Sequence, residues 1–85
     1  MFDPTGAYRL SPRVGLRPEP FGALAYHFDT RRLVFLKSTD LVDLVESLDS
    51  HPNAGAAIDA YAPERRRSFE AALESLIESG VVEAA

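Results

Sequence analysis

The sequence predicts an α+β domain, in which a three-stranded antiparallel sheet is followed by three helices in a winged-helix-like arrangement. Apolar residues alternate with a period of two before Ser38, and they recur at helical spacing after it. The 85 residues contain no internal repeat and no tract that resembles a linker. We therefore expect one domain over residues 9–85, preceded by a flexible arm of residues 1–8 that could dock through Phe2 or Tyr8.

Three segments have the pattern of strands. Residues 13–17 alternate between apolar and polar side chains and are ended by two prolines. Residues 22–28 alternate in the same way before a polar turn. Residues 32–37 (RLVFLK) are apolar on both faces. That pattern indicates a strand that is covered on two sides or one that awaits a cover.

Three helices are predicted in the second half of the chain. The first covers residues 38–48, with a polar cap and an acidic first turn. A short second helix follows the cap residue Asn53. The third begins at Pro63 and stops at Gly80, which suits the left-handed end of a helix. Its apolar stripe consists of Phe69, Ala72, Leu73, Leu76 and Ile77.

The composition argues against catalysis and metal binding. The chain has no cysteine, so a disulfide framework, a thiolate metal site and a thiol nucleophile are excluded. His27 and His51 are isolated, and neither a nucleophile elbow nor a glycine-rich phosphate loop is present. No apolar run approaches the roughly 20 residues that span a bilayer, and no signal peptide is recognisable. We expect a cytoplasmic, non-catalytic protein without a cofactor, a metal or a membrane partner.

Charge is distributed unevenly along the chain. Residues 1–37 hold six bases and three acids, a net charge of +3, whereas residues 38–85 hold three bases and ten acids, a net charge of −7. The first half could attract an acidic ligand. Alternatively, these are ordinary solvated charges with no common purpose.

Nucleic-acid binding is an alternative function, because the third helix opens with Arg65, Arg66 and Arg67. Glu70 and the acidic residues that follow it at four-residue steps form a ridge that would repel phosphates. The net charge of −4 also disfavours a winged-helix-type nucleic-acid-binding accessory domain. A structural subunit of a larger enzyme is a further alternative.

Peptide binding by strand addition fits the apolar segments better. If residues 32–37 lie at the sheet edge, their free backbone groups can pair with an extended peptide. Arg65 and Arg66 would flank the apolar stripe of the third helix, which would form the wall of a groove. Two alternatives remain open: residues 32–37 form a central core strand, and the arginines pair locally, as Arg66 could with Glu70.

Residues 8–52 resemble the PqqD-like peptide chaperones, also called precursor-peptide recognition elements, and within them the small chaperone of the mycofactocin pathway. The resemblance is most specific over residues 14–24 (VGLRPEPFGAL) and continues in Arg31-Arg32-Leu33 and Phe35-Leu36-Lys37. Over the third helix only the general leucine pattern, ending in Ser-Gly-Val-Val at residues 79–82, is similar.

The resemblance implies a non-catalytic chaperone that binds the leader of a ribosomally synthesised precursor peptide as an added strand. It further implies delivery of that peptide to a radical S-adenosylmethionine maturase, which carries the iron–sulfur clusters and the chemistry. Leaders in such systems are often acidic, which would give Arg31 and its basic neighbours a purpose. The residues expected to bind the peptide are Arg32, Leu33, Val34, Phe35, Leu36, Lys37, Arg65, Arg66, Phe69, Leu73 and Leu76.

Overall fold

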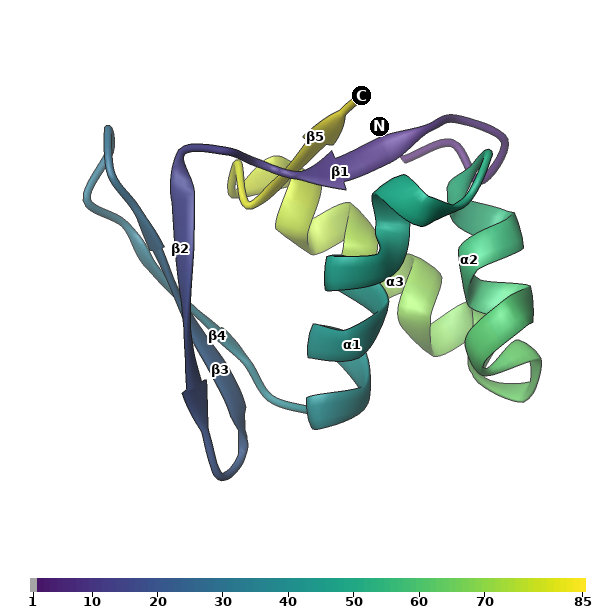
Figure 1. The fold of residues 1–85 in the computed structure, drawn as a ribbon, viewed down its shortest axis with the longest axis horizontal. Helices are drawn as coiled ribbons and strands as arrows, with labels where there is room; N and C mark the ends of the chain where they lie inside the picture. The colour runs from purple at the N-terminus through teal and green to yellow at the C-terminus, as the bar shows by residue number, and fades with distance from the viewer. Residues whose placement is uncertain (1) are drawn as a thin grey trace.

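A computed structural model describes residues 2–85 and places a small sheet beside three helices (Figure 1). The α+β fold with a three-stranded antiparallel sheet and three helices is confirmed. The elements in chain order are β1 (Tyr8–Leu10), β2 (Val14–Glu19), β3 (Gly22–His27), β4 (Leu33–Leu36), α1 (Thr39–Ser47), the 3-10 turn η1 (Leu48–Ser50), α2 (Ala54–Tyr61), the 3-10 turn η2 (Pro63–Arg65), α3 (Arg66–Glu78) and β5 (Val82–Ala84).

The three-stranded sheet has the order β2-β3-β4, with antiparallel neighbours. The chain makes this meander through two short turns, so each strand pairs with the next one along the sequence. The segment that is apolar on both faces is β4, and it lies at an edge of the sheet rather than at its centre. Residues 33–36 therefore form an edge strand and not the central core strand that the sequence also allowed.

A second, two-stranded sheet was missed by the sequence analysis. β1 and β5 pair antiparallel, with Leu10 opposite Val82 and Arg9 opposite Glu83. The Arg9 guanidinium donates to the Glu83 carboxylate at 2.7 Å, and this contact holds the pKa of that carboxyl below its ordinary value. Each strand has only three residues, too few to show a period of two.

The N-terminal segment lies against α2. The Gly55 N–H donates to the Pro4 carbonyl at 2.8 Å. The ring of Phe2 stacks on Tyr8, with 5.5 Å between centroids, and Tyr8 is buried. These are the two side chains through which docking was expected. Met1 lies outside the described residues, and the flexibility of this arm stays a prediction.

Three helix ends follow the sequence signals, whereas α3 begins at Arg66, after the 3-10 turn η2, and not at Pro63 as expected. The Ser38 hydroxyl accepts hydrogen bonds from the N–H groups of Asp40 and Leu41, and the Asn53 side chain accepts one from Ala56. Gly80 has φ +83°, as expected for a glycine that ends a helix in the left-handed region. These caps fix where α1 and α2 begin and where α3 stops.

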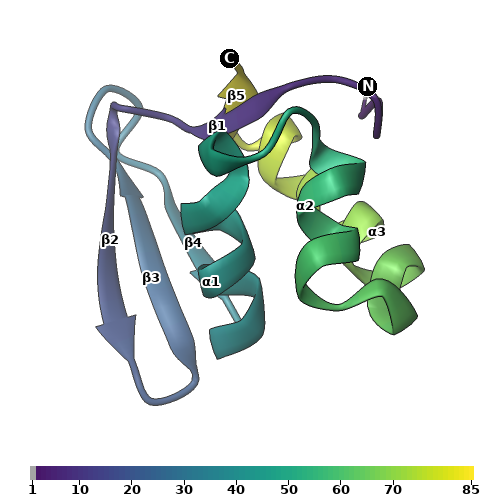
Figure 2. The ribbon, with the colours of Figure 1, turned by 45° about the vertical axis from the view of Figure 1, so that its right-hand side comes forward.

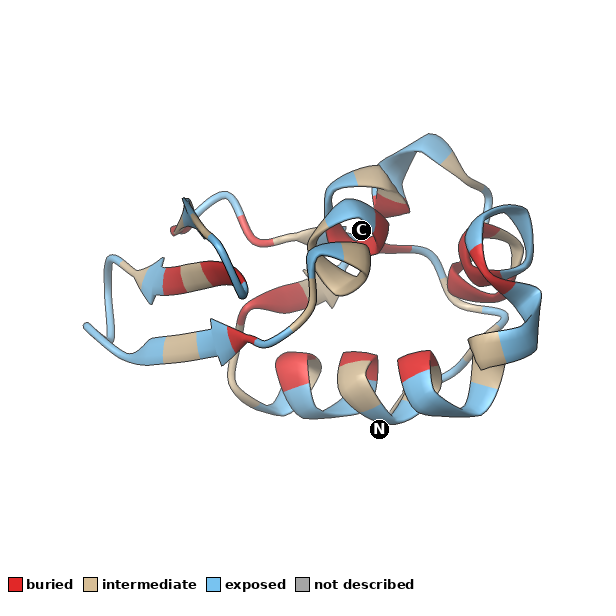
Figure 3. Ribbon diagram, turned by 90° about the horizontal axis from the view of Figure 1, so that it is seen from below, coloured by how far each residue is buried: buried red, intermediate tan, exposed pale blue. Residues whose placement is uncertain are grey.

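All three helices lie on one side of the β2-β3-β4 sheet (Figures 1 and 2). Buried residues line the sides of the helices that face the middle of the molecule (Figure 3). The largest fully buried side chains are Phe69, Leu36, Leu44, Leu48, Ile58, Leu73, Val45, Val81 and Val82. Because Leu36 is among them, the end of β4 is anchored in the core while the rest of the strand stays at the surface.

Within residues 2–85, no helix is both long and apolar enough to cross a bilayer.

Gly22 sets the close approach between the β2–β3 turn and the end of β4. Its φ is +151°, and a Cβ built there would lie 2.0 Å from the Leu36 carbonyl oxygen. We expect Gly22→Ala to destabilise the fold by about 2 kcal/mol or more, since it combines a strained φ with a backbone clash.

Urea unfolding followed by circular dichroism measures this loss of stability. Gly15→Ala is the matched control, because a Cβ there would meet only the end of the Phe28 ring, at 3.2 Å. Equal stabilities of the two variants would contradict the role given to Gly22.

Candidate functional site

The candidate site is the free edge of β4. On the β3 side, the His27 N–H donates to the Arg32 carbonyl at 3.0 Å. Hydrogen-bonded pairs alternate along an antiparallel ladder, so the next residues of β4 that bond to β3 are Val34 and Leu36. The residues between them are left with their backbone groups turned outward.

These outward groups belong to Leu33 and Phe35. Each presents one N–H and one C=O away from β3, and no other described segment of residues 2–85 pairs with them. Backbone N–H and C=O groups require hydrogen-bond partners. In the free protein, water molecules are the partners of these outward groups. The edge therefore offers four backbone groups to an extended chain.

The opposite edge of the sheet is protected. On β2, the Phe28 N–H donates to the Arg13 carbonyl, and the alternation then places Pro18 at a position that faces the free edge. Proline has no N–H, so this edge lacks a donor for a further strand. Strand addition is thus possible along β4 and is obstructed along β2.

The side chains of β4 divide between two faces. Leu33 and Phe35 are 55% and 59% exposed and point away from the helices. Val34 is half-buried and Leu36 is fully buried, on the face that packs on the helices. An added strand would accordingly meet apolar surface on both of its faces.

The cations at the ends of β4 carry no counterion. Arg31, Arg32 and Lys37 are exposed, and none forms an ion pair within residues 2–85. Arg31 has φ +60°, an uncommon conformation for a residue with a side chain, at the turn that leads into β4. Three positive charges therefore bracket the four-residue edge.

Two of the three arginines around the start of the third helix, Arg65 and Arg66, are paired within the protein. Arg65 donates to Asp40 at 2.6 Å and stands 4.7 Å over the ring of Phe69. Arg66 donates to Glu70 at 2.9 Å and to Asp59 at 2.7 Å, and these bonds raise its pKa. The local pairing considered for Arg66 with Glu70 is confirmed. It also leaves these two arginines with less capacity for phosphate, which weakens the nucleic-acid alternative.

The expected groove wall is corrected by the structure. Phe69, Leu73 and Leu76 were expected to line an open groove, but each is at most 4% exposed and belongs to the hydrophobic core. The reason is that their stripe is the one that packs α3 on the other elements, which a helical period cannot distinguish from a binding face.

Other side chains keep apolar surface at the edge of the core. Val34 of β4, Leu41 of α1 and Ile77 of α3 are half-buried and pack against the buried cluster. The sequence analysis assigned Ile77 to the apolar stripe of the third helix and not to the site. Only partial exposure distinguishes these three side chains, and no sequence signal carries that information.

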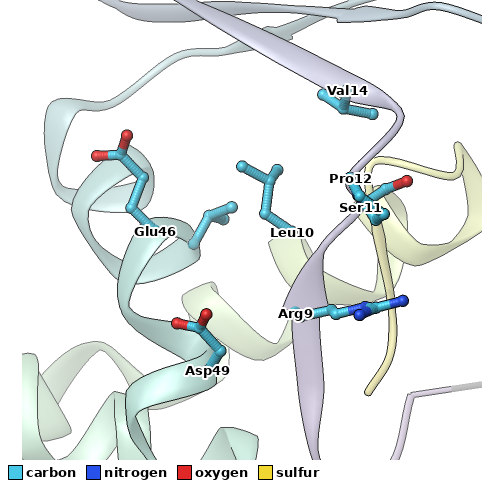
Figure 4. A pocket seen from close by; sticks show the side chains of 8 residues that line it. Arg9, Leu10, Ser11, Pro12, Val14, Glu46 and Asp49 are labelled. Atoms are coloured by element: carbon cyan, nitrogen blue, oxygen red, sulfur yellow. The ribbon is translucent and has the colours of Figure 1, made fainter.

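The cavity shown in Figure 4 has a volume of about 500 Å³ and lies between the β1–β2 connection and α1. Leu10 points into it, while Glu46 and Asp49 stand on the helical side (Figure 4). The Ser11 hydroxyl accepts from the Arg13 N–H, and Arg9 is bonded to Glu83. The complete lining is Arg9, Leu10, Ser11, Pro12, Val14, Val45, Glu46 and Asp49. This lining contains no histidine or cysteine to activate the serine.

The two histidines do not assemble a site. His27 is half-buried at the end of β3, where its Nδ1 accepts from the N–H groups of Asp29 and Thr30. His51 follows the turn η1, in the connection to α2. Among residues 2–85, no group of three His, Asp or Glu side chains could hold a metal ion.

The phenol of Tyr61 donates to Asp40 and Asp43, beside Arg65. Partial burial and then these two hydrogen bonds raise the pKa of Tyr61 to about 12. We expect this tyrosine to stay neutral and bonded at neutral pH, and to ionise only near pH 12, because ionisation would place a third negative charge beside two carboxylates.

Absorbance titration of tyrosinate tests this, with circular dichroism to confirm that the protein is still folded. Tyr61→Phe should remove the latest ionisation step, and Asp40→Asn should move that step to lower pH. The expectation is wrong if Tyr61→Phe instead removes a step at the ordinary pKa of 10.0.

Comparisons with known proteins are consistent with a binding role. The chain matches the model of the Peptide chaperone MftB family over residues 7–83. It is 45% identical to the peptide chaperone MftB of Mycolicibacterium smegmatis over 83 residues, which are 95% of this chain and 81% of the relative. It is 51% identical over 59 residues to the peptide chaperone MftB of Mycobacterium ulcerans, covering 69% of this chain and 54% of that relative.

A third relative, the peptide chaperone MftB of Mycobacterium tuberculosis, is 50% identical over 56 residues, covering 66% of this chain and 51% of the relative. The chain thus spans about half the length of the last two relatives. No solved structure matches it. The relatives are named as chaperones, a non-catalytic role, and the expectation that this protein is not an enzyme is confirmed. The chain belongs to the Peptide chaperone MftB family.

Proposed function

We propose that this protein binds the leader segment of a ribosomally synthesised precursor peptide as an added strand on β4. The observation that carries the proposal is the pair of outward-facing residues Leu33 and Phe35, whose backbone groups have no partner in residues 2–85. The proline in the opposite edge gives the sheet one open side, which supports a single binding position.

The bound strand would have two kinds of side-chain contact. On one face, alternate residues of the peptide would lie beside Leu33 and Phe35. On the other face they would lie beside the half-buried Val34. Main-chain hydrogen bonds would supply affinity, and these two apolar surfaces would supply selectivity.

The unpaired cations favour an acidic leader. A second copy of the chain could in principle pair along β4, but an antiparallel arrangement would bring Arg31 and Arg32 of one copy toward Lys37 of the other. Like charges at a strand edge oppose such pairing, whereas an acidic strand is attracted. The edge is thus guarded against self-association and remains available to the leader.

The contribution of α3 is revised accordingly. Phe69, Leu73 and Leu76 would act through the hydrophobic core that carries the sheet and not by touching the peptide, since they are core residues. Arg65 and Arg66 already form ion pairs with carboxylates of the protein. The carboxylates of an acidic leader would have to compete with these partners for the two guanidinium groups. Their part in binding is consequently smaller than that of Arg32 and Lys37.

Membership of the Peptide chaperone MftB family supports a proposal for the pathway. We infer that the peptide is delivered to a radical S-adenosylmethionine maturase of mycofactocin biosynthesis, in the cytoplasm, with this protein supplying no cofactor. The resemblance implies that the maturase oxidatively decarboxylates and then cross-links the C-terminal Val-Tyr of the precursor. The chaperone would hold the leader while that chemistry takes place elsewhere in a ternary complex.

Amide hydrogen exchange tests the register directly. In the free protein, the amides of Leu33 and Phe35 should exchange quickly, and those of Val34 and Leu36 slowly, because only the latter bond to β3. A synthetic acidic leader should slow the first pair and leave the second unchanged. If the leader binds without protecting Leu33 or Phe35, strand addition on β4 is ruled out.

Removal of one edge donor should weaken the complex. Phe35→Pro is expected to lower leader affinity by about tenfold, since proline lacks the outward N–H, while Phe35→Ala keeps that donor and controls for the lost ring. Fluorescence anisotropy measures both affinities, with thermal unfolding as the check on folding. Equal affinities of these two variants would argue that the side chain matters and the backbone does not.

Charge reversal at the ends of β4 should act mainly on association. Arg32→Glu combined with Lys37→Glu should weaken an acidic leader by about tenfold at low salt, with most of the change in the association rate. Arg67→Glu is the matched control, because Arg67 is an exposed cation of α3 without an ion pair among the described residues. Stopped-flow measurement at two salt concentrations provides the rates. A salt-independent affinity would show that these cations are merely solvated.

A further inference from the structure

The face of the sheet opposite the helices is apolar and uncovered. Six large apolar side chains of the described residues are more than a third exposed, and five of them belong to β3, β4 or the turns beside them. The helices all lie on the other side (Figures 1 and 2). The five are Phe21, Tyr26, Phe28, Leu33 and Phe35, and we call the surface that they form with Leu24 the outer face.

The outer face is not flat: it carries two aromatic pairs and a hollow. Phe21 meets Phe35 edge to face at 5.9 Å, and Tyr26 meets Phe28 in the same way at 5.8 Å. Between these aromatic pairs lies a hollow of about 330 Å³. Its lining is Gly15, Leu16, Arg17, Leu24, Tyr26 and Leu33.

A second depression, shallow and wide open, lies beside Phe35 on the outer face. It is lined by Phe21, Phe35 and Lys37. Exposed apolar patches with defined hollows are typical of surfaces that bind another protein, in which a protruding side chain fills each hollow. A bilayer surface offers no such protrusion, so the hollow between the aromatic pairs favours a protein over a membrane.

The charge around the outer face is positive. Residues 13–37 contain five bases and two acids, a net charge of +3. Both acids form ion pairs within the protein: Asp29 pairs with Arg13 at 2.8 Å, and Glu19 pairs with Arg17 at 2.6 Å. The remaining three cations are the unpaired ones at the ends of β4. A partner that covers this face must therefore carry carboxylates around its apolar patch.

We propose that the outer face docks a folded protein whose apolar surface is ringed by Asp and Glu side chains, and that this protein is the enzyme that receives the peptide. The identity of the enzyme rests on the proposed function, whereas the chemistry of the partner rests on the outer face itself. A second copy of this chain fits less well, since two outer faces would meet with a charge of +3 on each side.

The outer face is continuous with the peptide edge. Leu33 and Phe35 contribute their side chains to the outer face and their backbone groups to the edge of β4. A peptide added to β4 would widen the sheet by one strand and present its alternate side chains beside the docked enzyme. Peptide and enzyme would therefore contact each other, and each should increase the affinity of the other.

The test separates the outer face from the edge. Leu24→Ser combined with Phe28→Ser removes apolar surface from β3 and its following turn, and leaves β4 intact. Phe28→Asp is a second variant that places a negative charge on the face, at a side chain that is 56% exposed and little needed for folding. Tyr61→Ser is the matched control, an exposed aromatic on the helical side.

Affinity for the purified radical S-adenosylmethionine maturase is measured by biolayer interferometry, and affinity for the synthetic leader by anisotropy. Both outer-face variants should bind the maturase about tenfold more weakly, and the control within about twofold of the wild type. Leader affinity should stay the same in all of them. Unchanged maturase affinity in a folded outer-face variant overturns the proposal.

Other occupants give distinct results. Sedimentation that shows a wild-type dimer and a monomeric outer-face variant would assign the outer face to a second copy and overturn the proposal. Binding of the wild type, but not the variant, to vesicles of phosphatidylcholine and phosphatidylglycerol would assign it to a membrane, with the same consequence. If the wild type binds the maturase through the outer face but fails to bind the leader, the docking surface stands and the proposed function falls.

Discussion

β4 is hydrogen-bonded along one side only, and the rest of the molecule is arranged around that constraint. Its outward N–H and C=O groups must be satisfied by water or by another chain, because no element of residues 2–85 covers them. Leu36 fixes one end of the strand in the core, and Gly22 lets the β2–β3 turn approach its backbone. The end of the strand is thus anchored in the core while its edge stays open.

The helices stabilise this edge without covering it. Their apolar stripes are used to form a single core, which leaves Phe69 and its neighbours unavailable as an open wall. Arg65 and Arg66, around the start of α3, are bound to carboxylates of α1, α2 and α3 itself. Apart from Arg67, the unpaired positive charge of the described residues therefore gathers at the sheet, and the negative charge of the chain gathers at the helices. An acidic ligand is drawn toward the sheet by that separation.

The short strand β4 contributes to both the peptide-binding edge and the outer face, because the backbone groups and the side chains of a strand point in different directions. The backbone groups of Leu33 and Phe35 lie in the plane of the sheet, while their side chains stand perpendicular to it. An extended peptide in the plane and a folded protein above the plane can therefore bind at the same time, because the main-chain hydrogen bonds of the peptide do not use the side chains that face the protein. A four-residue strand can in this way support the ternary complex that a delivery function requires.

The sequence by itself determined the three strands of the larger sheet, the three helices and those helix ends that carry a cap signal. The change of period at Ser38, the cap residue Asn53 and the left-handed Gly80 are local signals, and local backbone geometry obeys them. The residues over 14–24 and 31–37 were also sufficient to indicate the family, and the match over residues 7–83 agrees with them.

Only the tertiary structure decided that the two-faced strand is an edge, that β1 pairs with β5, and which apolar stripe is buried. These features depend on contacts between residues far apart in the chain, such as Arg9 and Glu83, which are 74 positions apart. A period of 2 or 3.6 records which side chains share a face, but it does not record what lies against that face. Exposure at Leu33 and Phe35, and burial at Leu73, follow from the packing of the whole domain.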